Sequence, residues 1–270
     1  KAIDVLYGQI QRQPRTHEGS FWHKAIYPNQ VWLDGLYMAQ VFYSKYTAEF
    51  ENGEHYGDIL NQFRTVRSRM FDPETGLYRH GYDASKTAFW CLENGCSRNP
   101  WLRSLGWFSA ALIDVTTEVK DDPEFIDEMT GIAKELAKNL LPYIDADSGM
   151  LWQVPNQIGR AGNYPETSGS AMVAYFYLKG ARLGILDKSY APVGAKIFHS
   201  ICERYLTETE GKLNLGGICL VAGLGPENNR RRDGTYEYYI SEPIVENDAK
   251  GLAPFLMCYT ELLLSEKEEI

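Results

Sequence analysis

The sequence has 270 residues, of which 44% are hydrophobic, which is enough to bury one large core. Its formal net charge is −9 at neutral pH, and no basic block or stripe accompanies that charge. This distribution excludes nucleic acid and anionic membrane surfaces as expected partners, and an anionic ligand would need locally placed cations. We therefore expect a single domain spanning residues 1–270, in an oligomeric state that the sequence leaves open.

The five cysteines form neither a CxxC pair nor a set with histidine at metal-ligand spacing. This pattern argues against a disulfide framework and a structural zinc site, and it fits reduced thiols in a cytoplasm. No apolar run approaches the roughly 18 residues of a membrane span, and no charged-then-apolar leader opens the chain. We expect neither a metal nor a cofactor.

Helical periodicity dominates the chain. Four segments have the apolar spacing of an amphipathic helix: roughly 1–12, 54–70, 123–142 and 188–206. Each is followed by a short turn with a glycine: Gly19, Gly76, Gly149 and Gly211. Beyond each turn, an irregular stretch leads to a helix rich in small and apolar residues: 32–39, 104–112, 168–175 and 250–257. The second set is predicted to be inner helices buried on both sides, and the first set outer helices facing water.

Four outer-then-inner hairpins bury their faces by stacking side by side, in an open solenoid or a closed ring. The connections before the inner helices are long and rich in aromatic and charged residues, which favours a ring with a functional rim. A ring of six hairpins needs two more. Because the chain opens inside a helix without an N-cap, we expect the two additional hairpins to precede Lys1.

The first rim segment brings together His23, Lys24, four aromatic residues that include Trp32, and Asp34. It leads into the N-terminus of an inner helix, whose positive dipole end suits an anionic ligand. Aromatic faces beside cations are typical of a uronic-acid pocket. Asp34 would be costly in a buried helix unless it is used or satisfied, although an N-terminal capping role is an equally open interpretation.

The second rim segment supplies His80 and Asp83, followed by Arg103 and Trp107. Arg103 and Trp107 are four residues apart and share one helical face, either at the mouth of the ring or simply packed together. His80 alone is more typical of a hydrogen-bonded structural histidine than of a catalytic one. Asp83 competes with Asp34 for the role of an acid.

At these residues the chain resembles glycoside hydrolase family 105, the unsaturated rhamnogalacturonyl hydrolases. The resembling blocks run in order along the chain: GSFWHK at 19–24, WLDGLYMA at 32–39, RSLGW at 103–107, NYPETSGS at 163–170 and YISEPIVEND at 239–248. The resemblance implies an all-α (α/α)6 barrel, with about eight of its twelve helices in this chain. It also implies that the family's N-terminal part, which carries a second site carboxylate, lies ahead of Lys1.

The resemblance implies removal of a terminal unsaturated galacturonic acid from rhamnogalacturonan fragments of pectin, by hydration of its C4=C5 double bond. Asp34 would then be the catalytic proton donor, held protonated, and would afterwards activate the water. The implied substrate-binding residues are His23, Lys24, Trp32, Met38, His80, Arg103 and Trp107.

Other functions remain alternatives at this stage. An unsaturated glucuronyl hydrolase acting on glycosaminoglycan fragments would share the mechanism, although the rims carry no dedicated sulfate cluster. An inverting glycosidase would need two carboxylates about 6.5 to 9.5 Å apart, for which Asp34 and Asp83 are candidates. A non-catalytic carbohydrate-binding toroid and a protein-binding solenoid belong to other functional classes.

Overall fold

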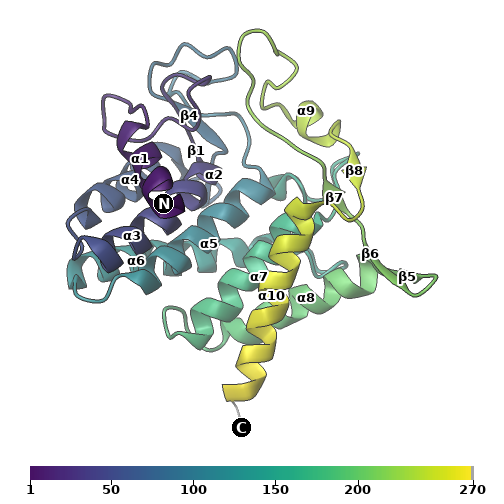
Figure 1. Ribbon diagram of the computed structural model, residues 1–270. Helices are drawn as coiled ribbons and strands as arrows, with labels where there is room; N and C mark the ends of the chain where they lie inside the picture. The colour runs from purple at the N-terminus through teal and green to yellow at the C-terminus, as the bar shows by residue number, and fades with distance from the viewer. Residues whose placement is uncertain (269–270) are drawn as a thin grey trace.

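The computed structural model describes residues 1–268, which form two rows of helices (Figure 1). The outer row consists of α1 (Ala2–Arg12), α4 (Tyr56–Met70), α6 (Pro123–Leu140) and α8 (Tyr190–Tyr205). The inner row consists of α3 (Val41–Phe50), α5 (Leu102–Glu118), α7 (Thr167–Arg182) and α10 (Ala249–Glu268). Neighbouring inner helices pack against each other, and each outer helix packs against an inner one. The predicted order of outer-then-inner hairpins is therefore confirmed.

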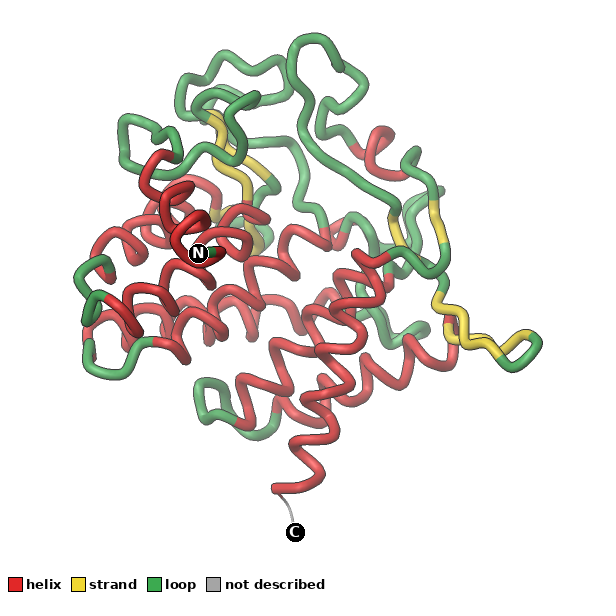
Figure 2. The backbone as a smooth tube through the Cα atoms, in the orientation of Figure 1, coloured by secondary structure: helices red, strands yellow, loops and turns green. Residues whose placement is uncertain are grey.

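The connections gather at one end of the helices, above the inner row in Figure 2. They contain short antiparallel strand pairs: β1 (Gln30–Trp32) with β4 (Gly81–Asp83), β2 (Phe71–Asp72) with β3 (Leu77–Tyr78), β5 (Leu206–Thr209) with β6 (Lys212–Leu215), and β7 (Ile218–Cys219) with β8 (Ile244–Val245). Short helical turns complete them: η2 (Leu141–Tyr143), η3 (Pro155–Gln157) and α9 (Tyr236–Ile240). The rim thus has more local structure than the sequence suggested.

The repeated glycine turns are confirmed, because all four predicted glycines have positive φ angles. The values are 86° at Gly19, 70° at Gly76, 65° at Gly149 and 73° at Gly211. A side chain rarely adopts this backbone conformation, so glycine at each repeat lets the chain reverse after an outer helix.

The prediction that every inner helix is buried on both sides holds for α5 and α7 but not for the first inner helix, where Met38 is 57% exposed, nor for α10. Leu256 on α10 is 58% exposed and Tyr259 is 44% exposed. The reason is that α10 packs against α7 and α8 on one side only within the described residues. A helix of this composition therefore presents an apolar face to the surface.

The first inner helix also begins later than predicted. Trp32 lies in β1 rather than in the helix, which starts at α2 (Leu33–Gly35) and continues through η1 (Leu36–Gln40) into α3. The η1 segment is a π-helical turn, which widens the helix immediately after Asp34. Such turns are rare and are frequent at functional sites.

Helices α5 and α7 approach closely through glycines, and this contact yields a testable matched pair. A Cβ added at Gly106 would lie 2.7 Å from the Cβ of Met172, whereas one added at Gly131 on α6 would meet nothing within 4 Å. We expect Gly106→Ala to destabilise the protein by about 1 to 3 kcal/mol, because it overpacks the core. Gly131→Ala should stabilise it by about 0.5 to 1 kcal/mol, because alanine favours the helix. Urea unfolding of both variants measures the difference, and equal midpoints would contradict the close packing.

No helix within residues 1–268 is long and apolar enough to cross a membrane.

Candidate active site

Asp34 and His80 meet because β1 and β4 pair in antiparallel register. Trp32 pairs with Gly81, and the backbone N–H of Leu33 donates to the carbonyl of His80 at 3.2 Å. The side chains that follow then come together: Nε2 of His80 lies 3.4 Å from Oδ2 of Asp34. His80 is completely buried, while the Asp34 side chain keeps 15% of its surface exposed. The carboxyl group is therefore enclosed but reachable.

The His23 ring stacks on the Trp32 indole, with ring centroids 4.1 Å apart and an angle of 11° between the planes. Trp32 is only 5% exposed, its Nε1 donates to Gln30, and its ring also packs against Tyr27 and the edge of His80. Trp32 thus holds His23 beside Asp34 and does not present a bare face for a sugar.

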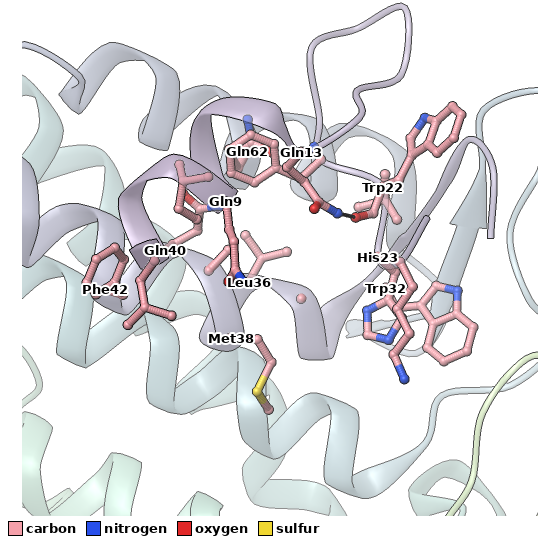
Figure 3. Close-up of a pocket in the computed structure, with 17 residues that line it drawn as sticks. Gln9, Gln13, Trp22, His23, Trp32, Leu36, Met38, Gln40, Phe42 and Gln62 are labelled. Carbon is pink, nitrogen blue, oxygen red and sulfur yellow. Dashed lines mark hydrogen bonds between the residues drawn. The ribbon is translucent and has the colours of Figure 1, made fainter. Parts of the chain in front are cut away.

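A cavity of about 350 Å³ opens beside this group (Figure 3). Its walls come from α1, the rim segment 13–24, β1, and the helical segment from α2 into α3, and Gln62 of α4 adds to them. His23, Lys24, Trp32 and Met38 line it; the Lys24 side chain is exposed and that of Met38 is 57% exposed. Four of the predicted binding residues therefore border one cavity. Asp34 lies next to its lining residue Gly35.

The expected protonation of Asp34 is wrong for the unliganded site. Burial raises the pKa of this carboxyl, but the hydrogen bond and charge of His80 and the charge of His23 outweigh burial, so the pKa is lowered overall. The carboxyl is then ionised at neutral pH. It can act as an acid only when a bound ligand raises its pKa again.

His23 itself is kept neutral, which predicts a pH dependence of stability. Burial lowers its pKa from 6.5 to about 4, and the charges of Lys24 and His80 act in the same direction, against the raising effect of Asp34. The unfolded chain therefore binds a proton between these pH values that the folded protein does not. Stability should be full above pH 6.5 and fall as the pH drops toward 4, by up to about 3 kcal/mol. Urea unfolding across this window measures the loss. His23→Gln should flatten the slope, and an unchanged slope would contradict the assignment.

Arg103 and Trp107 lie on α5, as predicted, but they do not line the cavity. Arg103 is 2% exposed; its Nε donates to Ser168 and its Nη2 to the carbonyl of Cys219. Trp107 packs against Tyr37 with ring centroids 4.6 Å apart. Arg103 reaches the Asp34 group only indirectly, since its guanidinium lies over Trp101, which in turn contacts His80.

The carboxylate of Asp83, which competes with Asp34 in the sequence analysis, accepts hydrogen bonds from its own loop. Its oxygens accept from the backbone N–H groups of Ser85, Thr87 and Ala88 and from the Ser85 hydroxyl. The carboxylate thereby folds the loop after β4. It is not free for proton transfer, which leaves Asp34 as the candidate acid.

Sequence reasoning missed the residues behind His80. Tyr239 of α9 lies with its hydroxyl 2.7 Å from Nδ1 of His80, and Gln153 links Trp101 to the Tyr239 carbonyl. Only the resembling block at 239–248 pointed to this region. Among residues 1–268 there is no cluster of three or more His, Cys, Asp or Glu side chains arranged to hold a metal.

Comparison with known proteins identifies the family to which this chain is similar. The model of Glycosyl Hydrolase Family 88 matches residues 1–265. Among solved structures, a family 105 glycoside hydrolase from C. acetobutylicum is 42% identical, with a TM-score of 0.94 over 97% of this chain and 73% of its own. The unsaturated glucuronyl hydrolase of Bacillus sp. GL1 is 12% identical with a TM-score of 0.69, covering 97% of this chain and 67% of its own, and shows the same fold.

Two curated proteins also match this chain. Protein Atu3128 of Agrobacterium fabrum is 39% identical over 216 residues, which are 77% of this chain and 90% of that protein. Unsaturated rhamnogalacturonyl hydrolase YesR of Bacillus subtilis is 27% identical over 193 residues, 67% of this chain and 52% of YesR. The solved relatives are (α/α)6 barrel enzymes, which confirms the predicted fold class. This chain therefore belongs to the glycoside hydrolases of families 88 and 105.

Proposed function

We propose that the protein removes a terminal Δ4,5-unsaturated galacturonic acid from rhamnogalacturonan oligosaccharides. One observation carries the proposal: the Asp34 carboxyl is enclosed beside two histidines at the border of a cavity that the exposed Lys24 side chain helps to line. A carboxyl group, two imidazoles and the Lys24 ammonium suit a small acidic sugar better than a neutral one. The relatives' family and the name of YesR support the same substrate class.

The reaction begins with proton transfer from Asp34 to C4 of the enol ether. The positive charge that develops is shared by C5 and the ring oxygen, and water adds at C5 while the Asp34 carboxylate takes up its proton. The resulting hemiketal opens, and the hemiacetal left at C1 then releases the neighbouring sugar. The double bond is thus consumed before the glycosidic bond breaks.

Binding of the substrate supplies the acid form of Asp34. A uronate carboxylate placed near Asp34 is a like charge, which raises the pKa that His80 and His23 lower in the free protein. An anionic substrate therefore generates its own proton donor. A neutral sugar would leave Asp34 ionised, which makes the uronate charge part of the specificity.

The test is turnover of an unsaturated galacturonyl-rhamnose disaccharide, followed by its ultraviolet absorbance and by release of rhamnose. Loss of absorbance together with rhamnose release supports hydration. Release with the absorbance intact indicates an ordinary glycosidase, and turnover restricted to unsaturated glucuronyl amino sugars assigns the glycosaminoglycan substrate. Binding without turnover of any unsaturated uronide would leave a carbohydrate-binding protein. A pectin-degrading role in a reducing compartment such as the cytoplasm, which the free cysteines fit, belongs to this proposal.

A further inference from the structure

The environment of the Tyr239 hydroxyl restricts what it can do. Tyr239 is fully buried in α9, and its hydroxyl has one hydrogen-bond partner within residues 1–268, Nδ1 of His80 at 2.7 Å. A buried hydroxyl that lacks an acceptor leaves its proton unsatisfied, at a cost comparable to a lost hydrogen bond. The phenol proton is retained at all ordinary pH values, because burial raises the pKa of Tyr239 well above 10. Tyr239 therefore acts as a donor, and Nδ1 of His80 as the acceptor.

The donor role of Tyr239 determines which nitrogen of the His80 ring carries the proton. A neutral histidine carries one ring proton, so a lone pair on Nδ1 requires the proton on Nε2. Nε2 is the atom that lies 3.4 Å from Oδ2 of Asp34. Neither atom has another hydrogen-bond partner among the described residues, so a proton on Nε2 faces the carboxylate at this distance, whereas the other tautomer would place two lone pairs face to face.

We propose that Tyr239 is a positioning residue, which fixes the His80 tautomer so that Nε2–H faces Asp34. The phenol, the imidazole and the carboxyl form one line of contacts from α9 through the segment before β4 to the start of α2. Its neighbours keep it rigid. The Tyr239 carbonyl accepts from Gln153, and Trp101 packs against both rings, 6.3 Å from Tyr239 and 4.8 Å from His80.

The consequence for catalysis rests on the proposed function. A fixed Nε2–H holds the Asp34 carboxyl in one orientation in the free protein and stabilises the carboxylate each time a proton has left it. Loss of the Tyr239 hydroxyl should therefore act on the chemical step more than on binding. Removal of groups that orient a reacting side chain through hydrogen bonds commonly costs about 10- to 100-fold in activity.

The direct test needs no substrate. Long-range proton–nitrogen NMR correlations of the ring separate a protonated from an unprotonated imidazole nitrogen, and His80→Gln identifies the His80 signals. Spectra are recorded about two pH units above the ordinary imidazole pKa. We expect Nε2 to carry the proton in the natural protein, and Tyr239→Phe to give a mixture of tautomers. A proton on Nδ1 in the natural protein would overturn the proposal.

The kinetic test uses a matched control. Tyr177 is also fully buried, and its hydroxyl makes one hydrogen bond, to the carbonyl of Ala137 away from the site. Tyr239→Phe should lower kcat by about 10- to 100-fold with KM nearly unchanged, whereas Tyr177→Phe should keep both constants. Equal kcat values in the two variants would refute a positioning role. If the natural protein turns over no unsaturated uronide, the proposed function fails, and the NMR result still decides the role of Tyr239.

Discussion

Asp34→Asn is expected to lower kcat on the unsaturated galacturonyl-rhamnose disaccharide by about 10²- to 10⁴-fold, the usual contribution of a general acid and base. An amide has nearly the same shape as a carboxyl group but neither gives a proton to C4 nor takes one from water. KM should change little, because His23, Lys24 and the cavity walls remain in place. The rate of absorbance loss under saturating substrate measures the effect.

Asp83→Asn is the matched control for this prediction. Asp83 is 2% exposed and accepts hydrogen bonds from its own loop, so its replacement should lower the unfolding midpoint and leave kcat within about threefold. Similar losses of kcat in both variants would favour a glycosidase that uses two carboxylates. Full activity of Asp34→Asn would remove Asp34 from the mechanism.

Glu166→Ala is expected to lower the free energy of unfolding by about 3 to 5 kcal/mol, because it leaves a buried cation without its counter-charge. The Glu166 side chain is completely buried, 3.8 Å from the Arg103 guanidinium. It also accepts from the backbone N–H groups of Ser168, Gly169 and Cys219, so it caps α7 and ties β7 to it. One side chain thus joins three segments of the fold. Urea unfolding at constant ionic strength measures the loss.

Two further variants separate the charge of Glu166 from its capping role. Glu166→Gln keeps an oxygen for the N-terminus of α7 but loses the charge, and should fall between the alanine variant and the natural protein. Adding Arg103→Met to Glu166→Gln removes the unpaired cation. If the double variant recovers no stability relative to Glu166→Gln, the ion pair is not the source of the effect.

Much of the fold follows from local rules. The outer helices lie within about two residues of their predicted bounds, since an amphipathic pattern reports which face is buried wherever the helix packs. The glycine turns were predictable because positive φ angles restrict the residue type. Neither the π-turn at Leu36–Gln40 nor the exposed face of α10 has a local signature. Both depend on what the neighbouring segments provide.

Part of the candidate site could be predicted from the sequence, but the interactions among its residues could not. Asp34, His23 and Lys24 lie close together in the chain, so their grouping was visible in the sequence. The ionisation of Asp34 depends on His80, which is brought to it by strand pairing, and that partnership has no local signature. Asp83 competed with Asp34 for the role of the acid, and the hydrogen bonds from its own loop became visible only in the structure. The contribution of Tyr239 was the hardest to predict from local sequence patterns, because Tyr239 is 159 residues from His80 in the chain.

This separation has a consequence for how the protein acquires its activity. Because the His80 and Tyr239 side chains are 159 residues apart in the chain, their hydrogen bond at the candidate site forms only after the helices between them have packed. A proteolytic fragment that ends before α9 keeps Asp34 and His80 but loses the Tyr239 hydroxyl behind His80. A ligand that binds the folded protein tightly should raise its melting temperature, and the size of this rise gives a way to rank candidate sugars.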